Sequence, residues 1–450
     1  MKNIIFLLFS LFSLNVFSQG QKIKLIDCIH AAQANKADVQ AIKTENEIAG
    51  LQSQEMLAKY LPQISLAYEF RNNPIIPSQI VPIGQFNSVI TDETRAIKFG
   101  TEWQQNAGIN LYQPIIDASV KSKISESKIN ERIKNTDLQI AEQELKYEVI
   151  KSFFSVYLKT LQLKNSLIDT IRTFKSLELI KLKFDESKVL KVEVNKASIN
   201  HNKALSNFKY NISDLVKEKI YLSFLTGLLL SEFLELEYDF EIFEKPGFFE
   251  IPKSLSFDSI LFIRQLTIKD DLIKRQIYSE KRKHLPTLGL QGFYGANQYS
   301  NKFDPFLRNT WYGSSYIGLQ VKMPILFSEN TVNRIRQFDM QSKGIKFRIE
   351  EEQNRLNKET VQLSEDIKYL NSQISFSKQN IELLVENVKL LQERLAEGQI
   401  NTYDLNSQEL ELQKEESILN ESKTELLKKK LDKINSSGNL NLFINSIQTN

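Results

Sequence analysis

Apolar residues recur at every seventh position along the second half of the chain, which is the period of a coiled coil. One series consists of Ile349, Leu356, Leu363 and Leu370, and an interleaved series consists of Ile367, Ile374, Ile381, Val388 and Leu395. Two interleaved series of this kind form the seam between packed helices. They end before Gly398 in RLAEGQINTYDL, where we expect the chain to reverse and a second helix to follow.

Helix breakers are absent from long parts of the chain. No Gly or Pro occurs from residue 115 to residue 226, and no Pro follows Pro324. A single helix over 115–226 would be about 170 Å long, which is implausible for one compact domain. The sequence therefore predicts a long antiparallel hairpin whose turn lies in FDESKVLK, residues 184–191.

Four shorter stretches alternate with a period of two residues, which predicts strands within 60–70, 103–113, 288–294 and 317–323. The first and third open with similar phrases, YLPQISL and HLPTLGL, in which Pro marks the change from helix to strand. Each strand has one apolar and one polar face. The apolar candidates are Ile64, Leu66, Tyr68, Phe70, Ile109, Leu111, Leu288, Leu290, Leu319 and Val321. The segments between paired strands are rich in Pro, Asn and Gly, and are predicted to be loops.

The two halves of the chain look like copies of one unit. The phrases LYQPIID and VKMPILF match with an offset of 210 residues between their prolines, and the two expected hairpin turns match at 211. Each half is then a helix, a strand, a loop, a strand and a helical hairpin. We place the first repeat at 19–235, an aromatic-rich linker at 236–253, the second repeat at 254–436 and a C-terminal tail at 437–450.

The first residues identify the compartment. Lys2, an apolar core over 4–17 and Ser18 are typical of a secretory signal peptide over 1–18, with an uncleaved anchor as the alternative. No other long apolar segment follows, so contact with a bilayer would use strands or an interfacial surface. A net charge of +3 gives no electrostatic reason to expect nucleic acid as a partner. Cys28 is the only cysteine, which excludes an intramolecular disulfide and favours a buried thiol near the first helix.

Four strands with one apolar face would form part of a membrane barrel if that face met lipid and the polar face met water. Four strands cannot close a barrel, so closure would require several copies of the chain. Three copies would supply twelve strands, together with twelve helical segments for a hollow helical cylinder. The predicted fold class is therefore mainly α with a small transmembrane β part.

The chain resembles the TolC family of outer-membrane efflux proteins over nearly all of its mature sequence. The phrases YLPQISL, HLPTLGL, LYQPIID, VKMPILF and RLAEGQINTYDLNSQEL carry the resemblance through their order and duplication. The resemblance implies a homotrimer with a twelve-stranded β-barrel in the outer membrane and an α-barrel in the periplasm. It also implies an exit duct for a Gram-negative cell, joined through a periplasmic adaptor protein to an inner-membrane pump of the RND or ABC type.

The same resemblance assigns roles to the hairpin ends. It implies adaptor contacts at Leu395, Glu397, Gly398 and Ile400 in the second repeat and at Phe184, Ser187 and Val189 in the first. A D-x-x-D pair of the family, which rings the closed tunnel mouth, is matched by Asp404, whereas Ser407 departs from it. The alternative for Asp404 is a carboxylate placed in the first turn of a helix, where the macrodipole favours it.

No enzyme signature is present. His30, His201 and His284 are scattered, and no HExxH or phosphate-loop spacing occurs, so we expect no catalysis, cofactor or metal. Two alternatives to an efflux duct stay open. The same fold could serve type I protein secretion, or the chain could be an envelope coiled-coil scaffold, which would leave the four duplicated strands without a reason.

Overall fold

The computed structural model describes residues 23–82, 94–229, 257, 260–304, 310–325, 329–397, 399–400 and 402–448. The predicted signal peptide at 1–18 and the linker at 236–253 lie outside the described residues. The chain forms two compact units. The helical unit comprises Met1–Glu45, Asn135–Leu266 and Phe347–Asn450, and the strand unit comprises Asn46–Lys134 and Thr267–Lys346. Both units draw on both halves of the chain.

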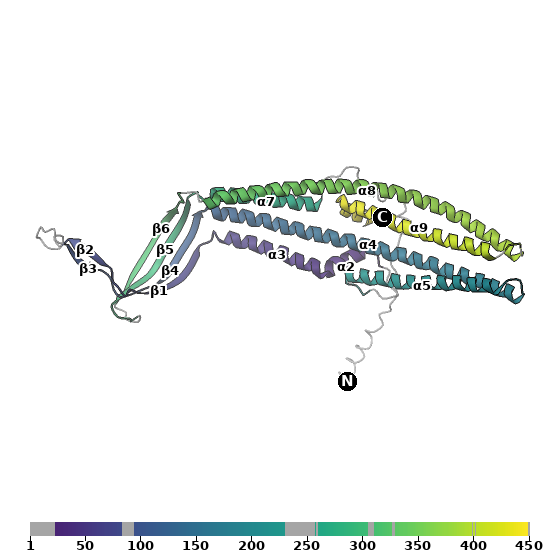
Figure 1. The fold of residues 1–450 in the computed structure, drawn as a ribbon. Coiled ribbons are helices and arrows are strands. Elements are labelled where there is room, and N and C mark those ends of the chain that lie inside the picture. Colours follow the sequence, from purple (N-terminus) through teal and green to yellow (C-terminus); the bar gives the residue numbers. More distant parts are fainter. Residues whose placement is uncertain are drawn as a thin grey trace, which may run out of the picture. The chain divides into compact units, whose positions relative to one another are not determined.

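The strand unit contains a four-stranded antiparallel sheet (Figure 1). Its strands are β1 (Gln63–Asn72), β4 (Trp103–Ile116), β5 (Thr287–Ser300) and β6 (Trp311–Lys322), in the order β1-β4-β5-β6. The four predicted strands are therefore confirmed, and the central β4–β5 ladder joins the first half of the chain to the second. The later part of α3 (Ala37–Ala58) and most of α7 (Leu261–Arg282) belong to the same unit.

The structure corrects two details of the strands. The segment between β1 and β4 was expected to be a loop, but it contains a two-stranded hairpin of β2 (Ser78–Pro82) and β3 (Thr94–Lys98). These strands are short and exposed, so they carry little alternation that a sequence could reveal. Strand β5 also extends past the expected residue 294 to Ser300. The polar end of β5, residues 295–300, pairs with β4 in the same ladder. There the side-chain amide of Asn106 donates a hydrogen bond of 2.8 Å to the side-chain oxygen of Asn297.

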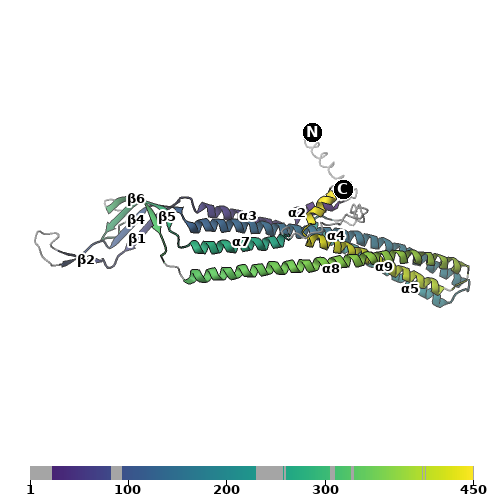
Figure 2. The same ribbon diagram turned by 90° about the horizontal axis from the view of Figure 1, so that it is seen from above.

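Two long helical hairpins contribute to the helical unit (Figures 1 and 2). The first consists of α4 (Ala118–Asp185) and α5 (Lys191–Thr226), which confirms the predicted reversal, and the second consists of α8 (Glu329–Ala396) and α9 (Thr402–Ser436). Helices α4 and α8 have 68 residues each. Because α8 starts 211 residues after α4, and α9 starts 211 residues after α5, the hairpins repeat with the offset found in the sequence.

The heptad residues of α8 form the seam that their period predicts. Leu356, Leu363 and Leu370 are buried, and nearer the turn Val388 and Leu395 pack with Leu405 and Leu412 of α9. The other members of the two series, Ile349, Ile367, Ile374 and Ile381, are partly buried. The absence of Gly and Pro therefore extends the helices, whereas the apolar period selects the face that packs.

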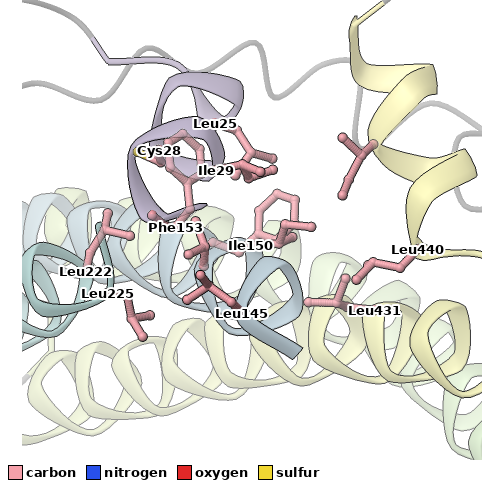
Figure 3. Close-up of a cluster of buried hydrophobic side chains, with 14 of the residues drawn as sticks. Leu25, Cys28, Ile29, Leu145, Ile150, Phe153, Leu222, Leu225, Leu431 and Leu440 are labelled. Carbon is pink, nitrogen blue, oxygen red and sulfur yellow. The ribbon is translucent and has the colours of Figure 1, made fainter. Parts of the chain in front are cut away.

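A larger core lies where α2 (Leu25–Asn35) and α10 (Leu440–Gln448) meet the long helices (Figure 3). Ile150 and Phe153 of α4, Leu222 of α5, Cys28 of α2 and Leu440 of α10 all belong to this buried cluster. The expected C-terminal tail at 437–450 is thus largely a helix with a buried apolar face. A short helix after a turn is hard to separate from a tail by periodicity alone.

We predict that Cys28 is unreactive in the folded protein. Its side chain is fully buried, and burial, with a smaller contribution from the Asp27 carboxylate, raises the pKa of the thiol to about 12. At pH 8 about one thiol in ten thousand would then be ionised. A disulfide-exchange reagent should react only after denaturation, whereas an exposed cysteine placed by Ser375→Cys in a Cys28→Ala background should react at once. Rapid labelling of native Cys28 would contradict the buried core.

Candidate functional site

The register of the main sheet places all ten apolar candidates on one face. Ile64 pairs with Leu111 and Leu66 with Ile109 across β1 and β4, and Leu290 pairs with Leu319 across β5 and β6. In antiparallel strands directly paired residues project to the same side of the sheet. The remaining candidates, Tyr68, Phe70, Leu288 and Val321, have the same parity. We call this surface the apolar face.

The apolar face is exposed in the single chain. Leu66 is 84% exposed, and Leu319 and Val321 are also mostly exposed. At one end of the face Phe70 and Trp103 stack with their ring centroids 5.0 Å apart, and Phe303 packs on both rings at 5.1 and 5.2 Å. A contiguous apolar surface of this kind marks a contact with lipid or another chain.

Two glutamines on the apolar face escaped the sequence prediction. Gln105 pairs with Gln298 across β4 and β5, and both side chains are almost fully buried. Gln298 donates to the Asp304 carbonyl at 2.6 Å and to the Thr310 hydroxyl at 2.7 Å. Gln105 accepts a hydrogen bond from the Tyr68 hydroxyl. These contacts bury both glutamine side chains, so the glutamines are not part of the exposed apolar surface.

The opposite face of the sheet is mostly polar. It carries Gln63, Ser65, Glu69, Asn106, Asn110, Gln291, Asn297, Gln320 and Lys322. Phe293 is an exception that no sequence signal revealed, since it is buried on this face and stacks on Tyr316. Gly108 makes room for it, because a Cβ at Gly108 would lie 2.5 Å from the Phe293 ring.

The turn of the first hairpin uses an unfavourable backbone conformation. Ser187 is the one described non-glycine residue with a positive φ, at 63°. Its amide donates to the Phe184 carbonyl at 2.8 Å, and the Lys188 amide donates to the Lys183 carbonyl at 2.8 Å. These bonds satisfy carbonyls at the end of α4. Phe184 and Ser187 are exposed, and Val189 is half-buried against a small core of Leu177, Ile180, Val194 and Ala197.

The turn of the second hairpin repeats this capping pattern. The Gln399 amide donates to the Arg394 carbonyl at 3.0 Å, which is the same bond moved along the chain by 211 residues. Gly398, the counterpart of Ser187, lies outside the described residues. Glu397 is exposed and Ile400 is half-buried.

Leu395, for which the resemblance implies an adaptor contact, has its side chain buried in the single chain. It is only 2% exposed and packs with Val388, Leu405 and Leu412, so in this conformation its side chain belongs to the seam. The heptad period continues through Leu395 to the last turn of α8, which explains this burial. The adaptor contact of Leu395 stays a prediction.

The two hairpins are also linked near their ends by lysines that the sequence did not single out. Lys183 of α4 donates to the Leu395 carbonyl in the last turn of α8, where the macrodipole favours a cation. The Lys196 ammonium of α5 lies 5.6 Å from the centroid of the Tyr403 ring in α9. Asp404 follows Tyr403 and is exposed in the first turn of α9, as both interpretations of this residue require.

The described residues offer no helix that is both long and apolar enough to cross a membrane.

Within the described ranges, no group of three or more His, Cys, Asp and Glu side chains is arranged to hold a metal ion.

Several solved structures of outer-membrane channels have a fold similar to that of this chain. CusC, whose structures concern folding and transmembrane channel formation, aligns with a TM-score of 0.72 and 14% identity over 96% of this chain and 95% of its own. The CmeC outer-membrane channel of Campylobacter jejuni aligns with a TM-score of 0.72 and 15% identity over 92% and 85%. The open state of the MtrE outer-membrane channel of Neisseria gonorrhoeae gives 0.69 and 12% over 92% and 87%.

No protein-family model and no curated protein matches the chain. The likeness is therefore one of fold. The chain has the fold of these outer-membrane channels, which is the fold that the resemblance to the TolC family implied.

We predict that Ser187→Gly stabilises the first hairpin turn by about 0.5–1 kcal/mol. Glycine adopts a positive φ without a steric cost, and this gain exceeds the additional conformational entropy that glycine loses on folding. Hydrogen exchange of the Lys188 amide, which reports the capping bond, should slow accordingly. Glu186→Gly is the matched control. Because Glu186 has no positive φ, glycine there relieves no strain and only adds to the entropy lost on folding, so the Lys188 amide should exchange faster. Slower exchange in both variants would contradict this account of Ser187.

Proposed function

We propose that the chain is the subunit of an outer-membrane channel, an exit duct through which substrates leave a Gram-negative cell. The observation that carries the proposal is the sheet with one exposed apolar face and one polar face, in a chain with the fold of outer-membrane channels. In this arrangement the apolar face meets outer-membrane lipid and the polar face lines the lumen.

The free edges of the sheet favour a closed assembly of several copies. Strands β1 and β6 are the edges of the main sheet, and in lipid their backbone N–H and C=O groups would require hydrogen-bond partners. Pairing β1 of one copy with β6 of the next supplies them. Two copies would give eight strands, whose interior is just filled by side chains, whereas three give twelve and leave an aqueous lumen. A homotrimer with a twelve-stranded β-barrel follows.

A second stripe on α8 supports lateral packing between copies. Tyr369, Phe376, Leu383 and Leu390 recur every seven residues and are 65, 64, 60 and 49% exposed. They are distinct from the buried seam of the same helix. A heptad stripe that the chain leaves exposed suits a helix of a neighbouring copy, and rings of such contacts would form an α-barrel in the periplasm.

The hairpin ends would join the duct to its partners. We propose that Phe184, Ser187, Val189, Glu397, Gly398 and Ile400 contact a periplasmic adaptor protein, and that the adaptor connects the duct to an inner-membrane pump of the RND or ABC type. Three Asp404 carboxylates, one from each copy, would form a cation-attracting ring at the tunnel mouth. Transport through the duct is passive, and the pump supplies the energy.

Two measurements on detergent-extracted protein test the proposal. Light scattering corrected for bound detergent should give three times the mass of the mature chain, and the same material should form ion-conducting channels in planar bilayers. Asp404→Asn should lower the preference for cations without changing the mass. A monomer without conductance would refute the channel and favour an envelope scaffold.

A pair of neighbouring substitutions tests the orientation of β1. Leu66→Arg should reduce assembly in the outer membrane, because a charge on a lipid-facing strand costs about 2–4 kcal/mol at mid-bilayer. Ser65→Arg projects from the opposite face and should be tolerated. The amount of trimer in isolated outer membranes is the readout. Equal effects of the two changes would contradict a lipid-facing Leu66.

A further inference from the structure

The apolar core of the helical unit is interrupted on α4. The large core extends along this helix as far as Leu163, and the small core near the turn resumes at Leu177. Between them, the buried residues on α4 are Ser166, Asp169 and Thr173, and Asn211 of α5 and Glu409 of α9 are buried polar residues as well. We use the name polar layer for Asp169, Arg172, Asn211, Glu409, Gln413 and Glu416.

The polar layer ties α9 to α4 by charge and hydrogen bonding. Asp169 forms an ion pair with Arg172 one turn away and accepts a hydrogen bond from the side-chain amide of Gln413 on α9. A cavity of about 230 Å³ beside these contacts is lined by polar residues throughout. Its lining includes Asp169, Asn211, Gln413 and Glu416 of the polar layer.

The layer contains more acidic than basic groups. Burial is the largest cause that raises the pKa of Glu409 and of Glu416; the Arg172 guanidinium opposes it, and the Asp169 carboxylate adds to it. Other charged or titratable groups lie nearby. Lys175 of α4 lines a cavity with Glu409, and Lys414 of α9 lines the polar cavity with Glu416. On α5, a ring nitrogen of His201 lies 3.3 Å from the Thr173 hydroxyl. From α8, the Gln392 amide bonds to Glu409.

Several buried atoms of the layer have no hydrogen-bond partner. These are one carboxylate oxygen of Glu409, Nε of Arg172, and both the amide oxygen and the amide nitrogen of Asn211, which is only 3% exposed. Leaving such atoms unpaired costs free energy that the apolar layers on either side do not incur. The polar layer therefore stabilises the packing of these helices less than a fully apolar layer would.

We propose that the polar layer is a proton-dependent latch: α9 stays packed on α4 and α5 while Glu409 and Glu416 are protonated, and its packing loosens when both ionise against the single guanidinium of Arg172. The inference concerns packing within the helical unit and holds whether or not the chain forms a channel.

The direction of the pH effect follows from the raised pKa of both carboxyl groups. The packed state holds their protons more tightly than water does, so acid stabilises it. The stabilisation is complete below the ordinary carboxyl pKa of 4.5 and is lost as the pH rises through the raised values. A layer built on depressed carboxyl pKa values would respond in the opposite direction.

Hydrogen–deuterium exchange of the full-length protein in detergent tests the latch. Peptides from 405–420 should open about fivefold to tenfold more readily at pH 8 than at pH 5, after correction for the intrinsic exchange rate. Glu409→Gln together with Glu416→Gln should remove this pH dependence and keep α9 protected at both values. Glu411→Gln, an exposed carboxylate on the same helix, should leave the wild-type behaviour unchanged.

Arg172→Gln provides the opposite change. It leaves three carboxyl groups without their guanidinium, so α9 should exchange at least about tenfold faster at pH 8, and adding the two glutamate substitutions should restore protection. Exchange of α9 in the wild type that does not depend on pH, or a loss of protection in Arg172→Gln that the glutamate changes do not reverse, would overturn the proposal. If Arg172→Gln fails to fold, the glutamate pair alone decides.

Discussion

The register between β4 and β5 determines the character of the whole sheet. These strands come from different halves of the chain, and their pairing of Ile109 with Tyr294 and of Ala107 with Ala296 aligns the faces of the two halves. A slip by one residue would turn the apolar side chains of β5 and β6 toward the polar side chains of β1 and β4. Neither face would then suit lipid or water. The lipid-facing role that we propose depends on this single ladder, because β1 and β6 merely continue the alignment outward.

The sequence predicts the elements well where one period dominates. Heptads and the absence of Gly and Pro located the hairpins, and alternation located the four strands of the main sheet. The hairpin of β2 and β3 was missed because its five-residue strands are exposed on both faces. The polar end of β5 was missed because its strand character comes from the ladder with β4 and not from alternation. The burial of Leu395 follows from the heptad series to which its sequence position assigns it.

The candidate sites also differ in how far the sequence predicts them. The apolar face could be derived residue by residue, because strand parity is a local property. The contacts between hairpins could not be derived, since Lys183 and Leu395 are 212 residues apart and a lysine on a polar helix carries no signal of its partner. No pattern in the sequence predicts the polar layer either. Glu409 and Glu416 are spaced by seven like the apolar seam residues, but they fit the pattern of a solvated helix until the structure shows that Glu409 is buried and Glu416 is half-buried.

The duplicated architecture also shows where the two halves differ. The hairpins share the 68-residue length of their first helices, their offset and the capping bond at the turn, so the framework is the same. The first repeat carries the additional β2–β3 hairpin and the strained Ser187, whereas the second carries the outer heptad stripe of α8 and Asp404. In a symmetric trimer, identical repeats would present six equivalent helical hairpins. Because the repeats differ at the turn and on the exposed stripe, the trimer that we propose would present two kinds of hairpin end, linked within each copy by the hydrogen bond of the polar layer between Gln413 and Asp169.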